Sequence, residues 1–238
     1  MYWHTESQGK DKWYHYKKWE ACKEKGIQLI QIWEDDWDRN PDLVKSMLSH
    51  KLGFAQDKVY ARQTRVELVT KQVADTFLLT NHIQGAVDGS IRLGLYLGMT
   101  LVAVMVLKDE PSPEENTLNL LRFATSKQVV GGFTKLVNYI RKRIPEVAKV
   151  VTFSDNCVSD GGLYKNNGFV ATKQLPPDYM YVVDKQRYHK FGYRLKRFRN
   201  DPALVWQEGL TEKQLAELNG LERVWDAGKT KWELTFLR

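Results

Sequence analysis

The clearest hydrophobic pattern lies in the middle of the chain, where apolar positions recur with the spacing of one helix face. Between residues 132 and 144 these positions are Phe133, Leu136, Val137, Ile140 and Ile144, while polar and basic residues take the other face. An apolar run rich in β-branched residues follows at 147–154, which predicts a strand buried on both faces. Together they predict a helix packed on a sheet.

Further alternating and apolar runs predict the remainder of that sheet. We expect strands at 59–69, 91–96, 99–108, 118–124, 169–173 and 179–183, with a tight turn at 97–98 and a polar loop at 109–116. Thr70 suits an N-cap for a helix reaching about residue 79, and a short helix at 161–167 should end at Gly168. The fold class predicted is α/β (α+β), with a mixed central sheet flanked by helices over residues 56–184.

The two flanking segments carry weaker patterns. In residues 1–55 we expect a helix at 12–25, a half-buried strand at 27–33, and a second helix that begins at Pro41. In residues 185–238 Thr211 and Gln214 form a capping box ahead of a short helix, and 223–225 with 231–235 read as a hairpin turning at 226–229. The sequence thus predicts three consecutive segments.

Composition narrows the class of protein. Hydrophobic residues make up 42% and charged residues 27%, the balance of a globular chain. No apolar run approaches the length of a membrane span and no secretory signal is visible, so we expect a cytoplasmic protein with no membrane partner. The net charge of +7 suggests a polyanionic partner, although a merely basic soluble protein would show it too.

One stretch concentrates this positive charge among aromatic residues. Residues 186–199 interleave tyrosine and phenylalanine with six cations: Arg187, Lys190, Arg194, Lys196, Arg197 and Arg199. Cations of this kind neutralise phosphates while aromatic rings stack on bases, so the stretch predicts nucleic-acid binding, with DNA as the expected partner. The alternative is a strand with a solvated basic face and a buried aromatic face.

Two local motifs add candidate chemistry to the central domain. Gln128, Val130, Gly131 and Gly132 lie between a strand and the amphipathic helix, where exposed backbone N–H groups can bind an anion. Residues 163–169 read LYKNNGF. Both motifs, and the order of elements, resemble the GNAT-type N-acetyltransferases. The resemblance implies that the loop binds the pyrophosphate of acyl-CoA or another acyl donor, although Phe133 replaces a usual small residue.

In the same family the tyrosine of the second motif protonates the leaving thiolate. The resemblance gives this role to Tyr164, with plain packing on a short helix as the alternative. The central domain is also similar to Mom-type proteins, GNAT-like phage enzymes that modify adenine in DNA. That similarity places His82 and Asp155 at positions where they would orient and deprotonate an amine. The alternatives are a helix-end histidine and an N-cap.

Over its full length the sequence resembles a phage family of homing-endonuclease-like proteins, in which a Vsr-like nuclease segment precedes a GNAT-like domain. Matching stretches include residues 2–6, 26–37, 81–85, 121–123, 130–132 and 226–228. Residues 1–55 would then be a truncated nuclease remnant, with His4, Glu6 and His15 as leftover site residues. The metal-binding Asp expected just before them is absent. Mg²⁺ is therefore expected only if a second chain completes the nuclease.

These observations lead to two hypotheses. The first is a DNA-associated protein of phage type, homing-endonuclease-like with a GNAT-like domain, whose nuclease activity is lost. The alternative is an active GNAT-type N-acyltransferase that modifies a DNA base or another amine. For this chain alone, acyl transfer is the more plausible enzymatic activity, because the nuclease Asp is missing whereas the element order of the central domain is intact.

Overall fold

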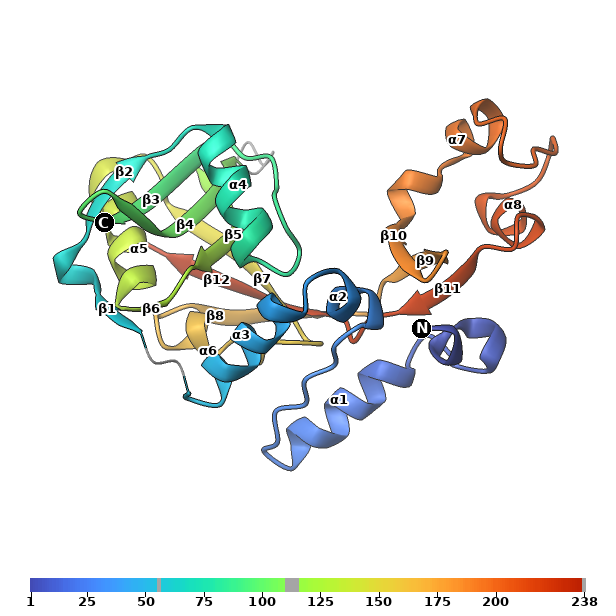
Figure 1. Ribbon diagram of the computed structural model, residues 1–238, viewed down its shortest axis with the longest axis horizontal. Coiled ribbons are helices and arrows are strands. Elements are labelled where there is room, and N and C mark those ends of the chain that lie inside the picture. Colours follow the sequence, from blue (N-terminus) through green and yellow to red (C-terminus); the bar gives the residue numbers. More distant parts are fainter. Residues whose placement is uncertain (55–56, 110–115, 237–238) are drawn as a thin grey trace. The chain divides into compact units, whose positions relative to one another are not determined.

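The computed structural model describes residues 1–54, 57–109 and 116–236, so most of the expected polar loop at 109–116 lies outside the described residues. Contacts divide the chain into two compact units that are each discontinuous in sequence (Figure 1). Unit 1 comprises Met1–Arg39, Asp155–Asp160 and Gln174–Lys229, and unit 2 comprises Asn40–Ser154, Gly161–Lys173 and Thr230–Arg238. The sequence analysis expected three consecutive segments instead.

Within the described residues, unit 2 is built on a seven-stranded sheet of order β2-β3-β4-β5-β7-β12-β8. The neighbours from β2 to β5 are antiparallel, whereas β5 and β7 are parallel. The strands are β2 (Arg65–Leu68), β3 (Ile91–Leu97), β4 (Thr100–Asp109), β5 (Thr117–Thr125), β7 (Lys149–Asp155), β12 (Lys229–Thr235) and β8 (Val170–Leu175). This mixed sheet flanked by helices confirms the predicted fold class.

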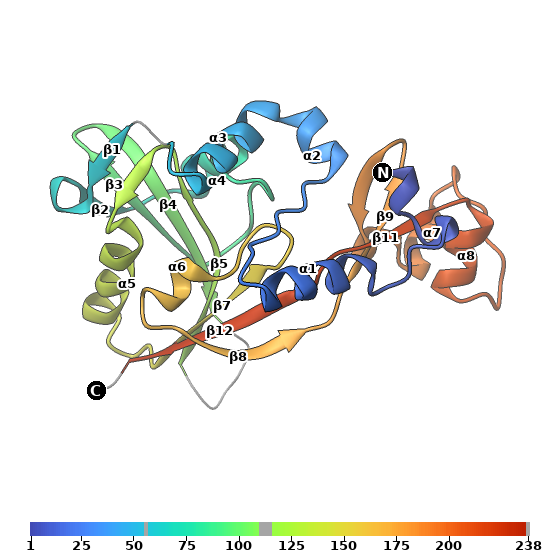
Figure 2. The same cartoon turned by 90° about the horizontal axis from the view of Figure 1, so that it is seen from below.

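Helices cover both faces of this sheet (Figure 2). α4 (Lys71–Asn81) begins at Thr70, whose hydroxyl accepts a hydrogen bond from the N–H of Val73, and α5 (Gly132–Arg143) begins at Gly131. The other elements of unit 2 are α3 (Pro41–Lys51), β1 (Lys58–Tyr60), η3 (Ala61–Gln63), β6 (Gln128–Val130) and α6 (Gly162–Lys165). The predicted helices at 70–79 and 132–144 are confirmed.

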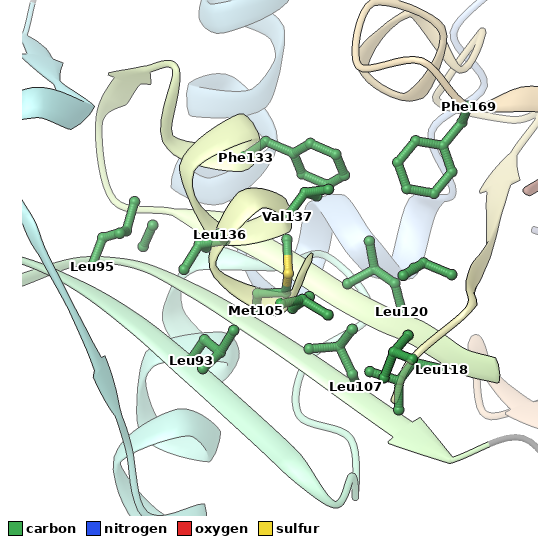
Figure 3. Packing of buried hydrophobic residues seen from close by; sticks show 14 of the residues in the cluster. Leu93, Leu95, Met105, Leu107, Leu118, Leu120, Phe133, Leu136, Val137 and Phe169 are labelled. Atoms are coloured by element: carbon green, nitrogen blue, oxygen red, sulfur yellow. The ribbon is translucent and has the colours of Figure 1, made fainter. Parts of the chain in front are cut away.

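The core of unit 2 lies mainly between the sheet and α5. Leucine, valine and methionine side chains of β3, β4 and β5 meet Phe133, Leu136, Val137 and Ile140 of α5, and Phe169 closes the cluster (Figure 3). A second cluster lies on the opposite face, where Ala74, Phe77 and Leu78 of α4 pack on Val104, Val106 and Ala124. The sheet is thus covered on both faces, as the apolar strands predict.

Unit 1 contains a three-stranded antiparallel sheet of order β10-β9-β11 among the described residues. Its elements are η1 (Tyr2–His4), η2 (Glu6–Gln8), α1 (Tyr14–Glu24), α2 (Glu34–Arg39), β9 (Tyr179–Val183), β10 (Gln186–His189), η4 (Lys190–Tyr193), α7 (Leu195–Asn200), α8 (Glu212–Leu218) and β11 (Glu222–Trp225). Tyr181, Tyr193, Phe198 and Leu215 form its largest apolar cluster. No helix in the described parts of the chain is long and apolar enough to cross a membrane.

Three predicted strands differ from the structure: one is absent, one is interrupted and one lies in another sheet. The residues at 27–33 pair with no other strand. Gln31 hydrogen-bonds instead to His15 of α1. The predicted strand at 59–69 is interrupted by η3, where the hydroxyl of Thr64 donates to the carbonyl of Ala61. The strand at 179–183 is present, but it pairs with β10 and β11 rather than in the central sheet.

The predicted hairpin at 223–235 is also wrong. β11 pairs with β9, whereas β12 takes the place of the last strand of the GNAT-like order, between β7 and β8. The connection carries a carboxylate that explains its shape, because Oδ1 of Asp226 accepts hydrogen bonds from the N–H groups of Asp178 and Gly228, each at 2.8 Å. These bonds fix an open connection where the sequence suggested a tight turn.

We predict that Gly161→Ala strongly destabilises unit 2. Gly161 has a φ of +77°, and an added Cβ would lie 2.0 Å from Cζ2 of Trp232, whose indole N–H donates to Ser154. Gly98→Ala is the matched control, since its φ is +57° but nothing lies within 4 Å. Urea unfolding should show a loss of about 1 kcal/mol for the control, and roughly 2 kcal/mol more for Gly161→Ala because Trp232 must move. Equal losses would contradict the packing described here.

Candidate functional site

The parallel ladder between β5 and β7 ends before either strand does. Thr117–Leu120 pairs with Lys149–Thr152, and beyond this point β5 continues to Thr125 and β7 to Asp155 without pairing to each other. At the last pair, the hydroxyl of Thr152 donates to the carbonyl oxygen of Leu120 at 2.9 Å. The two strands therefore separate at a defined position, and backbone groups beyond it are left without the other strand as partner.

A bulge in β5 coincides with this position. Leu107 of β4 pairs with Leu120, but the neighbouring Val106 pairs with Arg122, so Leu121 is an extra residue. An extra residue reverses the alternation of side chains along the strand. Leu120 and Leu107 belong to the cluster beneath α5, whereas Val106 belongs to the cluster beneath α4. Since paired residues share a face, Arg122 lies on the α4 face.

The neighbours of Arg122 confirm the reversal. Phe123 is on the α5 face, where its ring meets that of Phe133 edge-on with centroids 5.1 Å apart. Ala124 is on the α4 face beside Val104. In a regular strand, position 122 would share the α5 face with Leu118 and Leu120. The bulge therefore places a guanidinium on the α4 face at the level where β5 and β7 separate.

Arg122 is half-buried and incompletely paired. One Nη donates to the carbonyl oxygen of Leu121 at 2.8 Å, but the buried Nε has no hydrogen-bond partner. Burial lowers the pKa of the guanidinium. No carboxylate in the described parts of the chain forms an ion pair with it. A buried donor without a partner costs about 1–3 kcal/mol, so Arg122 is retained here at the expense of stability.

His82 lies within electrostatic range of Arg122. It follows the last turn of α4, where its backbone N–H donates to the carbonyl of Leu78 at 2.9 Å, and its Nδ1 accepts a hydrogen bond from the N–H of Gln84 at 3.1 Å. Burial, and then the charge of Arg122, lower the pKa of His82 to about 3. The ring is therefore neutral at physiological pH. Because Nδ1 accepts a hydrogen bond, the proton is on Nε2, which can act as a hydrogen-bond donor.

Tyr164 approaches the same position from α6. Its ring packs against Phe133, Phe169 and Trp232 at centroid distances of 5.8, 5.7 and 6.1 Å. Burial raises the pKa of the phenol, partly offset by a hydrogen bond with Thr152 and by the charge of Arg122. The hydroxyl is consequently protonated at neutral pH and available as a proton donor.

His82, Arg122 and Tyr164 form what we call the strand-gap cluster. The sequence analysis named His82 and Tyr164 and missed Arg122 and Thr152. One signal could have revealed Arg122, because it is the one charged residue in a mostly apolar predicted strand, at 118–124. A charge at such a position is uncommon unless it is paired or functional.

Asp155 serves a local role at the end of β7. Its side chain accepts a hydrogen bond from the N–H of Cys157 at 2.9 Å, and its carbonyl accepts from Val158 and Ser159. These bonds close a turn at 155–158 and cap no helix, since the next helix, α6, has Gly161 at its N-cap. Asp155 belongs to unit 1. A catalytic role beside His82 stays a prediction.

The loop at 128–132 has the geometry of an anion site. Gln128 and Val130 belong to β6, which pairs in parallel with β1, and Gly131 has a φ of +75° that favours glycine. No side chain caps α5, so N–H groups of its first turn remain available. Phe133 is buried and 3% exposed, so the residue that departs from the family pattern points into the core and away from the loop.

The cations of the basic stretch are largely paired within unit 1. Arg187 is buried, with its Nε 2.7 Å from Oδ1 of Asp35 and one Nη 2.7 Å from Oδ2 of Asp36, and its guanidinium lies over the ring of Trp33. Burial raises the pKa of Asp36 despite this cation. Arg187 is therefore not exposed for phosphates, contrary to its predicted role in binding DNA.

The other predicted DNA contacts are more exposed. Lys190 pairs with Asp178, Arg194 with Glu212 and Arg197 with Asp201, while Arg199 lies over Trp206. Lys196 is exposed on α7. The stretch forms a short strand, a 3₁₀ turn and a helix, so the alternative considered from sequence, a single strand with one basic face, is wrong.

Two of the residues proposed as a nuclease remnant, His4 and His15, form a hydrogen-bonded pair. Nδ1 of His15 donates to the amide oxygen of Gln31, so its Nε2 accepts from Nδ1 of His4 at 3.2 Å. Burial lowers the pKa of both rings. Glu6 instead forms an ion pair with Arg223. Within the described residues, no three histidine, cysteine or acidic side chains are arranged to hold a metal.

Comparisons with known proteins found similarity only among solved structures. No protein-family model and no curated protein matches the chain. Among solved structures, a Bacillus subtilis acetyltransferase in complex with CoA is 15% identical over 73% of this chain and 99% of its own, with a TM-score of 0.42. The ribosomal-protein-S18-alanine N-acetyltransferase of Escherichia coli is 11% identical over 74% and 95%, also at 0.42.

A GNAT-family acetyltransferase of Elizabethkingia anophelis with acetyl-CoA bound is 15% identical over 73% of this chain and 99% of its own, at a TM-score of 0.37. Because these similarities are low, the fold assignment rests on the strand order and the motifs of the chain itself. The resemblances to homing-endonuclease-like and Mom-type proteins stay predictions.

We expect Arg187→Ala to lower the free energy of unfolding by about 3–5 kcal/mol, because it leaves two buried carboxylates without their cation. Lys196→Ala, on an exposed cation of the same stretch, should change it by less than about 0.5 kcal/mol. Guanidinium unfolding of both variants tests this. Equal stability of Arg187→Ala and the parent chain would refute a structural role for the ion pair.

The histidine of the strand-gap cluster should make stability depend on pH. Because the pKa of His82 falls from 6.5 to about 3 on folding, the unfolded chain binds the proton more readily between these values. The stability it contributes is complete above pH 6.5 and is lost as the pH falls toward 3. As the pH is lowered from neutral to mildly acidic, the free energy of unfolding measured with urea should fall less for His82→Gln than for His50→Gln. His50 is exposed and serves as the control. Parallel losses would exclude a buried neutral His82.

Proposed function

We propose that unit 2 is an N-acyltransferase that takes its acyl group from acyl-CoA or a similar thioester. The observation that carries this proposal is the strand-gap cluster, in which Tyr164 and His82 both interact with Arg122, just beyond the position where β5 and β7 separate. An uncapped helix that begins at Gly131 belongs to the same unit. A proton donor and a bare helix N-terminus are the two features that thioester chemistry needs here.

The residues present fit an acyl-CoA donor. Backbone N–H groups from Gly131 onward would hold its pyrophosphate, and the buried Phe133 leaves that approach open. When bound, the donor supplies an electrophilic thioester carbonyl. The chain has to supply an orientation for the amine and a proton for the departing sulfur.

Tyr164 is assigned the role of general acid. In the transfer, a C–N bond forms and the C–S bond breaks, the phenol gives its proton to the sulfur, the amine loses a proton to solvent, and the tyrosinate takes a proton back from solvent. His82 is assigned a different role from the base suggested by the Mom-type resemblance. Because Gln84 occupies Nδ1, the ring can only donate a hydrogen bond through Nε2. It is suited to polarising or orienting an oxygen.

A second proposal is association with DNA, which would make the acceptor a base and agree with the homing-endonuclease-like resemblance. It is supported by the net charge of +7 and by exposed aromatic side chains in unit 1, among them Trp3 at 72% and Phe191 at 63% exposure. Mg²⁺ and a second chain belong only to the nuclease version of this proposal. Gel-shift titrations with single- and double-stranded DNA at several salt concentrations test it. Binding that Phe191→Ala and Lys196→Ala leave unchanged would exclude the basic stretch.

The acyltransferase proposal predicts release of free CoA when the protein is mixed with acetyl-CoA and an amine acceptor. Tyr164→Phe should reduce kcat by roughly 100-fold or more, since general acid catalysis contributes that much, while acetyl-CoA binding measured by calorimetry stays unchanged. Tyr139→Phe, on α5 of the same unit, is the control and should keep full activity. A protein that neither binds acetyl-CoA nor releases CoA with any amine is not an acyltransferase of this kind.

A further inference from the structure

Arg122 is a half-buried cation that the proposed acyl transfer does not use. Its Nε is buried without a hydrogen-bond partner, and its only hydrogen bond in the described parts of the chain runs to the carbonyl of Leu121. Core strands rarely retain a cation without a carboxylate nearby. The bulge at Leu121 also fixes the face of the sheet on which this side chain lies.

The position of Arg122 separates it from the presumed donor site. Arg122 lies on the α4 face of the sheet, with Val106 and Ala124, whereas α5 and its N-terminus at Gly131 cover the other face. An anion bound by Arg122 is therefore not the pyrophosphate held at the start of α5. The group that Arg122 would meet enters from the opposite face of the sheet, the side from which an acceptor could reach a thioester in the strand gap.

The groups facing this side are hydrogen-bond donors. Arg122 offers its Nε and the remaining guanidinium N–H groups in a planar fork, and His82 offers Nε2–H. Tyr164, whose ring packs in the cluster on the α5 face, interacts electrostatically with Arg122 from the donor side. A planar fork matches a carboxylate or a phosphate in a bidentate arrangement. A simple alkylammonium ion would be repelled by the same cation.

We propose that Arg122, with His82, is an oxyanion subsite for the acceptor, so that the amine acylated by this protein also carries a carboxylate or a phosphate. This inference rests on the proposed acyl transfer. Arg122 holds the acceptor by its anion and thereby orients its amine toward the strand gap. The bulge at Leu121 is the structural element that creates the preference, because it moves the guanidinium to the face on which the acceptor enters.

The test uses the full chain and two readouts. The first is the side-chain Nε–H signal of Arg122 in a nitrogen–proton correlation spectrum, identified by its absence from Arg122→Lys, during titration with acetate and with inorganic phosphate. The second is kcat/KM with three acceptors: β-alanine, 2-aminoethyl phosphate and propylamine. Arg122→Gln removes the charge, Arg122→Lys keeps it without the fork, and Arg141→Gln is a control on the exposed face of α5.

We expect a saturable shift of the Arg122 signal with acetate or phosphate, retained in Arg141→Gln. The parent chain should prefer an anionic acceptor over propylamine by about 10-fold or more, and both Arg122 variants should lose that preference mainly through KM. The anion that shifts the signal and raises kcat/KM identifies the carboxylate or the phosphate class.

Acyl transfer with no shift by either anion, or with the preference unchanged in both variants, overturns the subsite and leaves the proposed function intact. A shift without transfer to any amine overturns the assignment to an acceptor together with the proposed function. A loss in kcat alone, with KM and anion binding unchanged, assigns Arg122 to the transition state and also overturns the subsite.

Discussion

The site of unit 2 depends on one extra residue in β5. If β5 were a regular strand without the bulge at Leu121, position 122 would belong to the apolar face that packs beneath α5, and no cation could occupy it without breaking the core. The bulge resolves this conflict by reversing the side-chain alternation at the level where the ladder with β7 ends. Phe123 then completes the packing around Phe133 on one face, while Arg122 becomes available on the other. Packing and chemistry are thus assigned to opposite faces by a single backbone irregularity.

Features encoded within a short stretch could be predicted from the sequence. The apolar face of α5, the glycine at its start and the aromatic of α6 follow from local spacing, and the structure places them as expected. Arg122 could not be placed, because the face it occupies depends on its register with β4, which no pattern within β5 encodes. The burial of Arg187, which the sequence analysis had named as a DNA contact, could not be predicted for the same reason. Its carboxylate partners lie about 150 residues away, at Asp35 and Asp36, so its burial is a tertiary property.

The cations of the basic stretch in unit 1 are largely paired, which the amino-acid composition does not reveal. The chain is basic, yet in unit 1 most cations of the basic stretch neutralise carboxylates of the same unit, as Lys190 does with Asp178. A net charge counts residues and not the partners they already have. What distinguishes unit 1 is its aromatic content, since Tyr181, Tyr193 and Phe198 build its core while other rings remain exposed.

The strand order of unit 2 has a consequence for biosynthesis. β12 lies between β7 and β8, although it is made well after both of them. While the ribosome is still adding the segment between β8 and β12, two strand edges that will later be interior have no partner. The nascent chain must keep these edges from pairing with other chains until β12 emerges.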